Sequence, residues 1–226
     1  MTTPKMTLAF PYTFDPFTIT VQELMSQPCG LHDRAVCETD FTLLQPILYM
    51  TLVDTSGPVP KYFVYVRGKA SGEQRLAGKC SIGIGGHTEE FSVSTKYHIT
   101  SAVAHALAEG GSRELMEEVG LSISELEFVK ALLNQEADTT TESGIIIYKP
   151  FILYSPITDV DKVHIGISIG ISCTPDQLGS LEEGIITRGE WLTIVEIEAK
   201  EAAEESPIEL ETWSKTVLAN IMSKTA

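Results

Sequence analysis

The chain has few of the features that mark secreted, membrane or zinc-finger proteins. Its four cysteines are scattered and form no CxxC pair, so neither a structural zinc site nor a disulfide framework is expected. No run of about 18 apolar residues is present, and the N-terminus lacks a basic region followed by an apolar segment. We therefore predict a cytoplasmic protein with reduced thiols and no membrane partner.

Basic residues are also scarce: 16 Lys and Arg stand against 31 Asp and Glu, which gives a net charge of −15. Extended nucleic acid is thereby disfavoured as a partner, because phosphate contacts need clustered Lys and Arg. A nucleotide is not excluded, since a bound metal can neutralise carboxylates and phosphates locally. With 43% hydrophobic residues in 226, the chain has enough apolar side chains for one well-packed domain.

The most informative segment is residues 113–121, RELMEEVGL. On a helix, Glu114, Glu117 and Glu118 share one face within a ~100° arc. Three adjacent carboxylates repel one another unless a cation joins them, and a hard divalent ion with oxygen ligands is the natural partner. Gly120 fits the position just past a helix end. The alternative is a solvated acidic helix face, which is common in acidic chains.

A glycine cluster lies upstream, where Gly83, Gly85 and Gly86 stand at the end of the strand predicted over residues 80–84. Such glycines let the backbone approach a ligand closely, although a bulge or tight turn would also use them. His87 follows and could contact a phosphate, but we favour a hydrogen bond that braces the loop.

The acidic segment matches the second half of the Nudix box, RE-U-x-EE-x-G-U with U aliphatic. Upstream, residues 85–89 (GGHTE) resemble the GG-x-x-E that precedes the Nudix helix. Gly86 and Arg113 are 27 positions apart, about twice the usual spacing. Counting back by that spacing puts His105 where the box has its first glutamate and Ile99 where it has its glycine. That half of the box is therefore absent or displaced by an insertion between Glu89 and Arg113.

Four further segments resemble, in the expected order, MutT-like predicted phosphoesterases of bacteria and phages. They are residues 79–87 (KCSIGIGGH), 162–166 (KVHIG), 189–192 (GEWL) and 210–214 (LETWS). On these motifs the chain is identified as a member of the Nudix superfamily. The resemblance implies an α/β fold, a Nudix-type α/β/α sandwich with a mixed central β-sheet. We predict an N-terminal extension over residues 1–35 and a Nudix hydrolase domain over 36–226.

Patterning predicts the individual elements. Helices are expected near residues 21–25 and over 100–119 and 208–222, and whether Gly110 and Gly111 divide the second is left open. Residues 192–197 are expected either as a strand or as the lead into a helix. Turns are expected at 57–60 and 68–72. Strands are predicted over residues 46–53, 62–67, 80–84, 127–135, 144–154 and 163–171.

The resemblance implies a hydrolase that cleaves a pyrophosphate bond in a nucleoside diphosphate linked to another moiety. Mg²⁺, or Mn²⁺ in its place, would be held by Glu114 and Glu118, with Glu117 completing the cluster. Arg113 would pair with one carboxylate and fix its rotamer. The predicted substrate-binding residues are Gly85, Gly86, His87 and Glu89. The substrate class is a small nucleotide derivative, and the resemblance allows a homodimer, which is common in the superfamily.

Several points stay open at this stage. The general base cannot be placed; the candidates are Glu182, Glu183 and Glu190 and, on weaker grounds, Glu136, Asp138 and Glu142. His105 is expected to be structural, and Trp191 and Trp213 to be core anchors. One alternative function is a catalytically silent Nudix domain that binds a nucleotide or a partner. Another is an acidic interaction protein of unrelated α/β fold, which predicts no cavity shared by the glycine loop and the glutamate helix.

Overall fold

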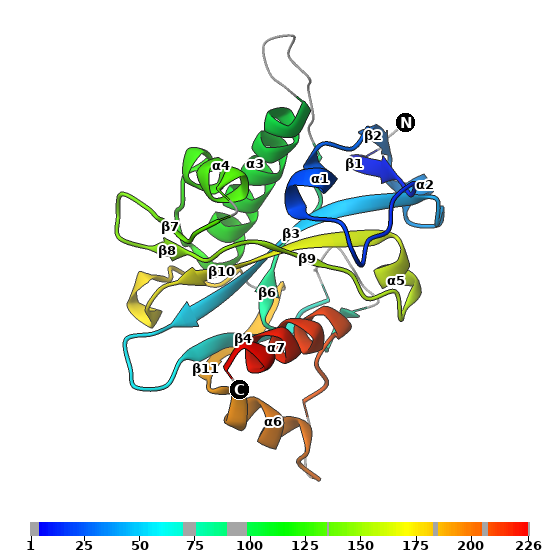
Figure 1. Cartoon of the computed structure of the whole chain (residues 1–226). Coiled ribbons are helices and arrows are strands. Elements are labelled where there is room, and N and C mark those ends of the chain that lie inside the picture. The colour runs from blue at the N-terminus through cyan, green and yellow to red at the C-terminus, as the bar shows by residue number, and fades with distance from the viewer. Residues whose placement is uncertain are drawn as a thin grey trace.

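In the computed structural model, a twisted sheet lies between two layers of helices (Figure 1). The structure describes residues 5–69, 76–89, 99–134, 136–182, 185–204 and 208–225. The strands are β1 (Met6–Pro11), β2 (Gly30–Asp33), β3 (Leu43–Asp54), β4 (Lys61–Arg67), β5 (Cys80–Ser81), β6 (Gly83–Ile84), β7 (Thr139–Thr140), β8 (Ile146–Ile147), β9 (Phe151–Leu153), β10 (His164–Ser172) and β11 (Ile186–Leu192). The helices are α1 (Val21–Met25), α2 (Arg34–Cys37), α3 (Ile99–Val119), α4 (Glu125–Leu133), α5 (Asp159–Lys162), α6 (Ile194–Glu201) and α7 (Thr212–Thr225).

The centre of the sheet is a parallel pair, β3 and β10, in the order β11-β4-β3-β10-β8-β7. Their register runs without a break from Gln45 opposite His164 to Val53 opposite Ser172. The other strand pairs in the described part of the chain are antiparallel. The sheet is therefore mixed, as predicted.

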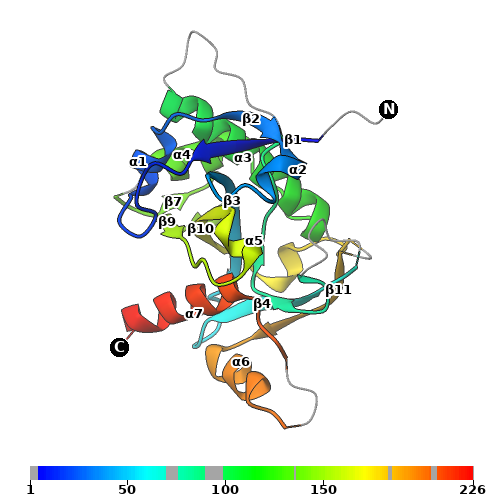
Figure 2. The ribbon, with the colours of Figure 1, turned by 90° about the vertical axis from the view of Figure 1, so that its right-hand side faces the viewer.

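Strict alternation along the strands gives the sheet two apolar faces. In β10 the odd-numbered isoleucines, Ile165 to Ile171, are fully buried in the core that α1, α3 and α4 cover. On the opposite face, Tyr49 and Val53 of β3 pack with Val217 of α7 and Ile197 of α6. Side chains of successive strand residues point to opposite faces, so one sheet can bury both. The α/β/α sandwich is thus confirmed (Figure 2).

The first residues of the chain contribute to this core. β1 pairs with β3 through Phe10 opposite Leu44, and Leu8, Phe10, Leu24 and Met25 belong to the α3 side of the core. The short helix expected at residues 21–25 is confirmed as α1. The domain boundary near residue 35 stays a prediction.

The strand predicted over residues 127–135 is wrong, because this segment is helix α4 up to Leu133. Ser124 caps the helix by accepting from the Glu127 amide, and the Glu127 carboxylate accepts from Ser124 in return. This capping box is a helix-start signal. The buried set Phe128, Val129, Ala131 and Leu132 has helical spacing, so the β-forming residues in it were misleading.

The other predicted elements need smaller corrections. Residues 144–154 form two short strands, β8 and β9, because Pro150 between them lacks a donor for the ladder. The expected helix over 208–222 begins at Thr212, and 192–197 leads from β11 into α6. The strands at 46–53, 62–67, 80–84 and 163–171 are confirmed, and 80–84 is divided into β5 and β6. Residues 70–72 of the expected turn lie outside the described part of the chain.

Helix α3 runs without interruption through both of its central glycines. A Cβ on Gly111 would lie 2.4 Å from Leu48 Cδ2, and one on Gly110 would lie 3.8 Å from the His87 carbonyl oxygen. Gly111 thus allows the helix to pack directly on β3, which outweighs its low helix propensity. None of the described helices is long and apolar enough to cross a membrane.

Candidate active site

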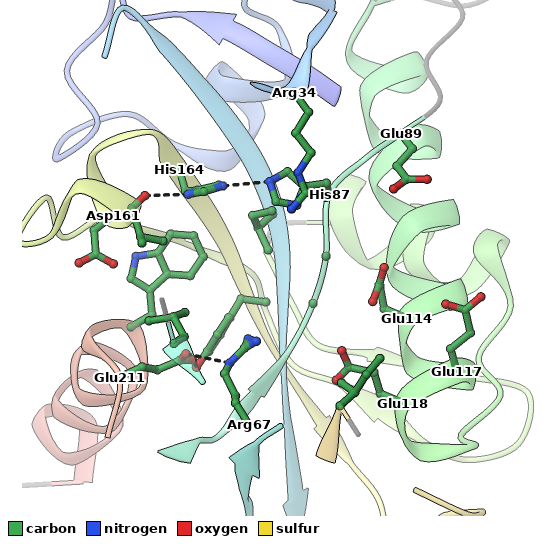
Figure 3. Close-up of a pocket in the computed structure, with 18 of the residues that line it drawn as sticks. Arg34, Arg67, His87, Glu89, Glu114, Glu117, Glu118, Asp161, His164 and Glu211 are labelled. Atoms are coloured by element: carbon green, nitrogen blue, oxygen red, sulfur yellow. Dashed lines mark hydrogen bonds and ion pairs between the residues drawn. The ribbon is translucent and has the colours of Figure 1, made fainter. Parts of the chain in front are cut away.

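One cavity of about 330 Å³ brings the predicted functional residues together (Figure 3). It lies between the N-terminal end of α7, the loop after β6 and the C-terminal half of α3. All eight residues predicted from the sequence line it: Gly85, Gly86, His87, Glu89, Arg113, Glu114, Glu117 and Glu118. Residues far away in the sequence complete the wall: Lys5, Arg34, Arg67, Asp161, His164, Glu211 and Trp213.

Helix α3 supplies an acidic wall. Leu115 and Val119 are fully buried in the core, which turns the intervening glutamates toward the cavity. Arg113 Nη1 lies 2.8 Å from Glu114 Oε1 and 3.2 Å from Glu117 Oε2. Glu118 is deepest, with 5% of its surface exposed. Gly120 ends the helix with a φ of 65°, in the left-handed region that a glycine tolerates best.

Glu118 is in an electrostatic environment that opposes its ionisation. Burial raises the pKa of Glu118 to about 8, and Glu114 and Glu182 add to the rise, while Arg67 opposes it. Burial likewise raises the pKa of Glu114, with Arg113 opposing and Glu117 reinforcing the shift. Glu118 Oε2 is buried and has no hydrogen-bond partner among the described residues. Such a group is costly unless something satisfies it.

The glycine loop lies directly against this wall. A Cβ on Gly86 would be 2.3 Å from Glu114 Oε1, and one on Gly85 would be 2.3 Å from the Leu48 carbonyl oxygen. A side chain at position 86 would displace the Glu114 carboxylate from the place that it occupies here. Glu89 contributes, after Glu114 and Glu117, to the raised pKa of Arg113, which burial alone would lower. The loop and the acidic helix thus form one charged unit.

The residues fit a divalent cation. The cluster offers carboxylate oxygens alone, which Mg²⁺ and Mn²⁺ prefer. Its most buried oxygen lacks a partner among the described residues, and the raised pKa values of Glu114 and Glu118 show that positive charge is deficient. A cation between these carboxylates would give the Glu118 oxygen a partner and would favour the ionised form of both glutamates.

The wall facing α3 contains a buried polar network that the sequence did not reveal. Arg67 Nε donates to Glu211 Oε2 at 3.1 Å, and Tyr49 Oη donates to Glu211 Oε1 at 2.8 Å. Ser81 also donates to Glu211, and Ser214 accepts from the Ile82 amide at 3.0 Å. The network fastens the start of α7 to β4 and β5. It gives a physical role to the LETWS and KCSIGIGGH segments.

Trp213, at the same helix end, is partly buried beside the cavity. It stands edge-on to Tyr49 with ring centroids 5.6 Å apart, and a Cβ on Gly166 would lie 3.0 Å from Trp213 Cζ3. Trp191 packs against Phe63 with centroids 5.5 Å apart. Both tryptophans pack against the core clusters, as expected, and Trp213 also lines the cavity.

A second group of ligand-type side chains includes His87 and His164 of the cavity wall (Figure 3) and Glu38 next to them. His87 Nε2 is 3.0 Å from His164 Nε2 and 3.4 Å from Glu38 Oε1. His164 Nδ1 is 2.7 Å from the Val160 carbonyl oxygen. The hydrogen bond with His87 lowers the pKa of Glu38 to about 2, against an opposing effect of burial. His164 was in a recognised motif, but its partnership with His87 required the fold.

The candidate general bases do not line the cavity in the described part of the chain. Glu190 pairs with Lys200 at 3.1 Å and with Arg188 at 3.3 Å. Asp138 accepts from the Lys149 amide, and Glu136 and Glu142 are exposed. Glu182 is exposed, but its amide donates to the Glu118 carbonyl at 3.1 Å. Glu183 lies outside the described residues.

The residues that stand where the Nudix box has its first half lie away from the cavity. His105 forms an ion pair with Glu125 at 2.8 Å, and neither lines the cavity. Residues 99–112 of the inserted stretch form the first part of α3, while 90–98 lie outside the described residues. The glycine loop and the glutamates thus border one cavity although 27 positions separate Gly86 from Arg113.

Comparison with known proteins identifies the fold. No family model matches the chain. Protein YmaB of Bacillus subtilis (strain 168) is 25% identical over 187 residues, which cover 82% of this chain and 74% of that protein. The crystal structure of Tm1382, a protein assigned provisionally to the Nudix hydrolases, superposes with a TM-score of 0.60 at 18% identity. It covers 97% of this chain and 99% of Tm1382.

The protein therefore has the Nudix fold. The similarity extends over nearly the whole chain, so it includes both the sheet and the helices on its two faces. The alternative of an unrelated α/β fold is wrong, because the glycine loop and the glutamate helix border a common cavity.

Proposed function

We propose that the cavity is the active site of a hydrolase that cleaves a phosphoanhydride bond in a nucleoside diphosphate linked to another moiety. The observation that carries the proposal is the buried Oε2 of Glu118, which has no hydrogen-bond partner among the described residues and lies in a cavity that Glu114 and Glu117 also line. Maintaining such a cluster is unfavourable in a protein that never binds a cation. Buried carboxylates that can hold a cation next to a glycine loop suit an enzyme that hydrolyses phosphate esters or anhydrides.

Glu114 and Glu118 would hold Mg²⁺ or Mn²⁺, with Glu117 as a further ligand directly or through water. When bound, such an ion lowers the pKa of a coordinated water and neutralises charge on phosphate oxygens. Arg113 holds the Glu114 carboxylate in place through the 2.8 Å ion pair. Gly86 leaves that carboxylate room, because it has no side chain.

The remaining walls suit an anionic substrate. Arg34 and Arg67 line the cavity across from the glutamates (Figure 3), and guanidinium groups bind phosphate oxygens in a planar, directional way. Trp213 offers an aromatic surface within the same cavity. These side chains favour one arrangement of the substrate: its phosphates lie between the glutamates and the arginines, and the rest of it extends toward Trp213.

The test is product release from a panel of nucleotide derivatives, with and without Mg²⁺ or Mn²⁺. The panel includes dinucleoside polyphosphates, nucleotide sugars, dinucleotide cofactors and nucleoside triphosphates. We expect metal-dependent release of a nucleoside monophosphate or phosphate from at least one member. The Glu118→Gln variant should lose it, and the His105→Asn variant, altered outside the cavity, should retain it. Tight metal-independent binding without turnover would instead support a silent nucleotide-binding module.

A further inference from the structure

A second group of side chains that could hold a metal ion borders the cavity, across from the acidic helix. It comes from three segments far apart in the sequence: Glu38 at the end of α2, His87 after β6 and His164 at the start of β10. Their ligand atoms all lie within 4.8 Å of one another. Figure 3 shows the two imidazoles meeting on the wall opposite Glu114 and Glu118.

The backbone fixes how these histidines meet. His164 is opposite Gln45 in the parallel β3–β10 register, and His87 forms a bridge with Ile47 on the other side of β3. Gln45 and Ile47 are two residues apart and therefore face the same side of the sheet. The two imidazoles are thus brought together over β3 by pairing on both of its edges, independently of any bound ion.

Two of the three distances in this group are close to those between ligands of one tetrahedral ion, and the third is within 4.8 Å. Bonds of about 2.05 Å at the tetrahedral angle put two ligand atoms about 3.3 Å apart. The observed separations are 3.0 Å between the two Nε2 atoms and 3.4 Å from His87 Nε2 to Glu38 Oε1. The His164 ring is already oriented by its Nδ1 contact with the Val160 carbonyl at 2.7 Å. Metal-binding histidines commonly use this second contact.

A neighbouring side chain adds an independent observation. Gln45 is fully buried, and neither its amide nitrogen nor its amide oxygen has a hydrogen-bond partner among the described residues. It is the register partner of His164. A buried amide without partners beside a cluster of ligands is expected where a bound water or an ion ligand completes the site.

We propose that Glu38, His87 and His164 form a zinc-type metal site whose fourth position faces the cavity. Two imidazole nitrogens and one carboxylate oxygen suit Zn²⁺, whereas the all-carboxylate group on α3 suits Mg²⁺. Three protein ligands leave one position for water or an anionic oxygen. Because His87 and His164 line the cavity, that position is accessible to a ligand there. The proposal does not depend on whether the cavity hydrolyses nucleotides.

An arrangement without an ion makes the opposite prediction. His87 would then donate its Nε2 proton to His164, and Arg34, 3.4 Å from Glu38 Oε1, would balance the carboxylate. In that case the protein takes up no zinc at this place. The two descriptions therefore predict different amounts of zinc bound per chain, which can be measured.

The experiment is zinc titration of the full chain by calorimetry after treatment with a chelator, in millimolar Mg²⁺, with bound metal counted by elemental analysis. We expect one zinc per chain, and at least tenfold weaker binding in His164→Asn and in Glu38→Gln. His105→Asn is the matched control, because His105 also pairs with a glutamate but belongs to no candidate metal group among the described residues. Glu118→Gln should bind zinc as the unmodified protein does.

X-ray absorption of the zinc-loaded unmodified protein supplies a readout that needs no variant. Two imidazole ligands in the zinc shell would support the site even if a variant failed to fold. Absence of zinc uptake, an oxygen-only shell, or loss of zinc in Glu118→Gln but not in His164→Asn would overturn the proposal.

Discussion

The buried carboxylate of Glu118 makes an unusual stability prediction. With a pKa of about 8 in the folded protein, against 4.5 for the ordinary group, the folded state retains a proton that the unfolded chain releases. The free energy of unfolding therefore falls as pH rises from about 4.5 to 8 and levels off above that range. Replacing Glu118 by glutamine removes the titrating group, so the variant should be more stable than the unmodified protein at alkaline pH.

The size of this difference in unfolding free energy follows from the pKa shift of Glu118. A change of about 3.5 pKa units at 1.36 kcal/mol each sets a ceiling of about 5 kcal/mol. Water penetration and relaxation reduce this in real proteins, so we expect Glu118→Gln to gain about 2–4 kcal/mol at pH 8.5 and close to nothing near pH 4.5.

Urea unfolding in EDTA at several pH values from 4.5 to 8.5 measures this difference. Glu117→Gln is the matched control, because it removes a carboxylate from the same helix at a side chain that is 53% exposed; its effect should stay below about 1 kcal/mol. Added Mg²⁺ should stabilise the unmodified protein at pH 8.5 more than Glu118→Gln. The reasoning is refuted if Glu118→Gln shows the same pH dependence as the unmodified chain.

Three further changes test other parts of the site. Gly86→Ala would place a Cβ 2.3 Å from Glu114 Oε1, so Mg²⁺ should bind at least tenfold more weakly, as measured by Mg²⁺-induced thermal stabilisation. An unchanged response to Mg²⁺ would contradict the role given to Gly86 in leaving room for the Glu114 carboxylate. Arg67→Met leaves the Glu211 carboxylate buried without its 3.1 Å partner and should cost about 3–5 kcal/mol in urea unfolding; a loss under 1 kcal/mol would mean that Glu211 is stabilised elsewhere. Ser124→Ala removes the cap of α4 and should cost about 1 kcal/mol, and an unshifted melting curve would show that packing alone fixes that helix.

Much of the architecture followed from local pattern. The apolar run at 46–53 and the alternating pattern at 163–171 predicted strands, and the structure shows that these two strands form the parallel pair at the centre of the sheet. The segment 113–121 predicted one helix face with three carboxylates, because the i, i+3, i+4 relation depends on helical geometry alone. The error at α4 was also local, since the Ser124–Glu127 capping box was in the sequence and was overlooked.

The gathering of the site was decided only by tertiary structure. Nothing local to Arg67 or Glu211 predicts that they pair, since 144 residues separate them. His87 meets His164 because β10 and the segment after β6 pair with opposite edges of β3, at positions two residues apart. Gly111 fits within helix α3 where the helix packs closely on Leu48 of β3, a contact that the sequence pattern does not show. Sequence periodicity determines which side chains share a face, whereas long-range pairing and close packing determine which faces meet.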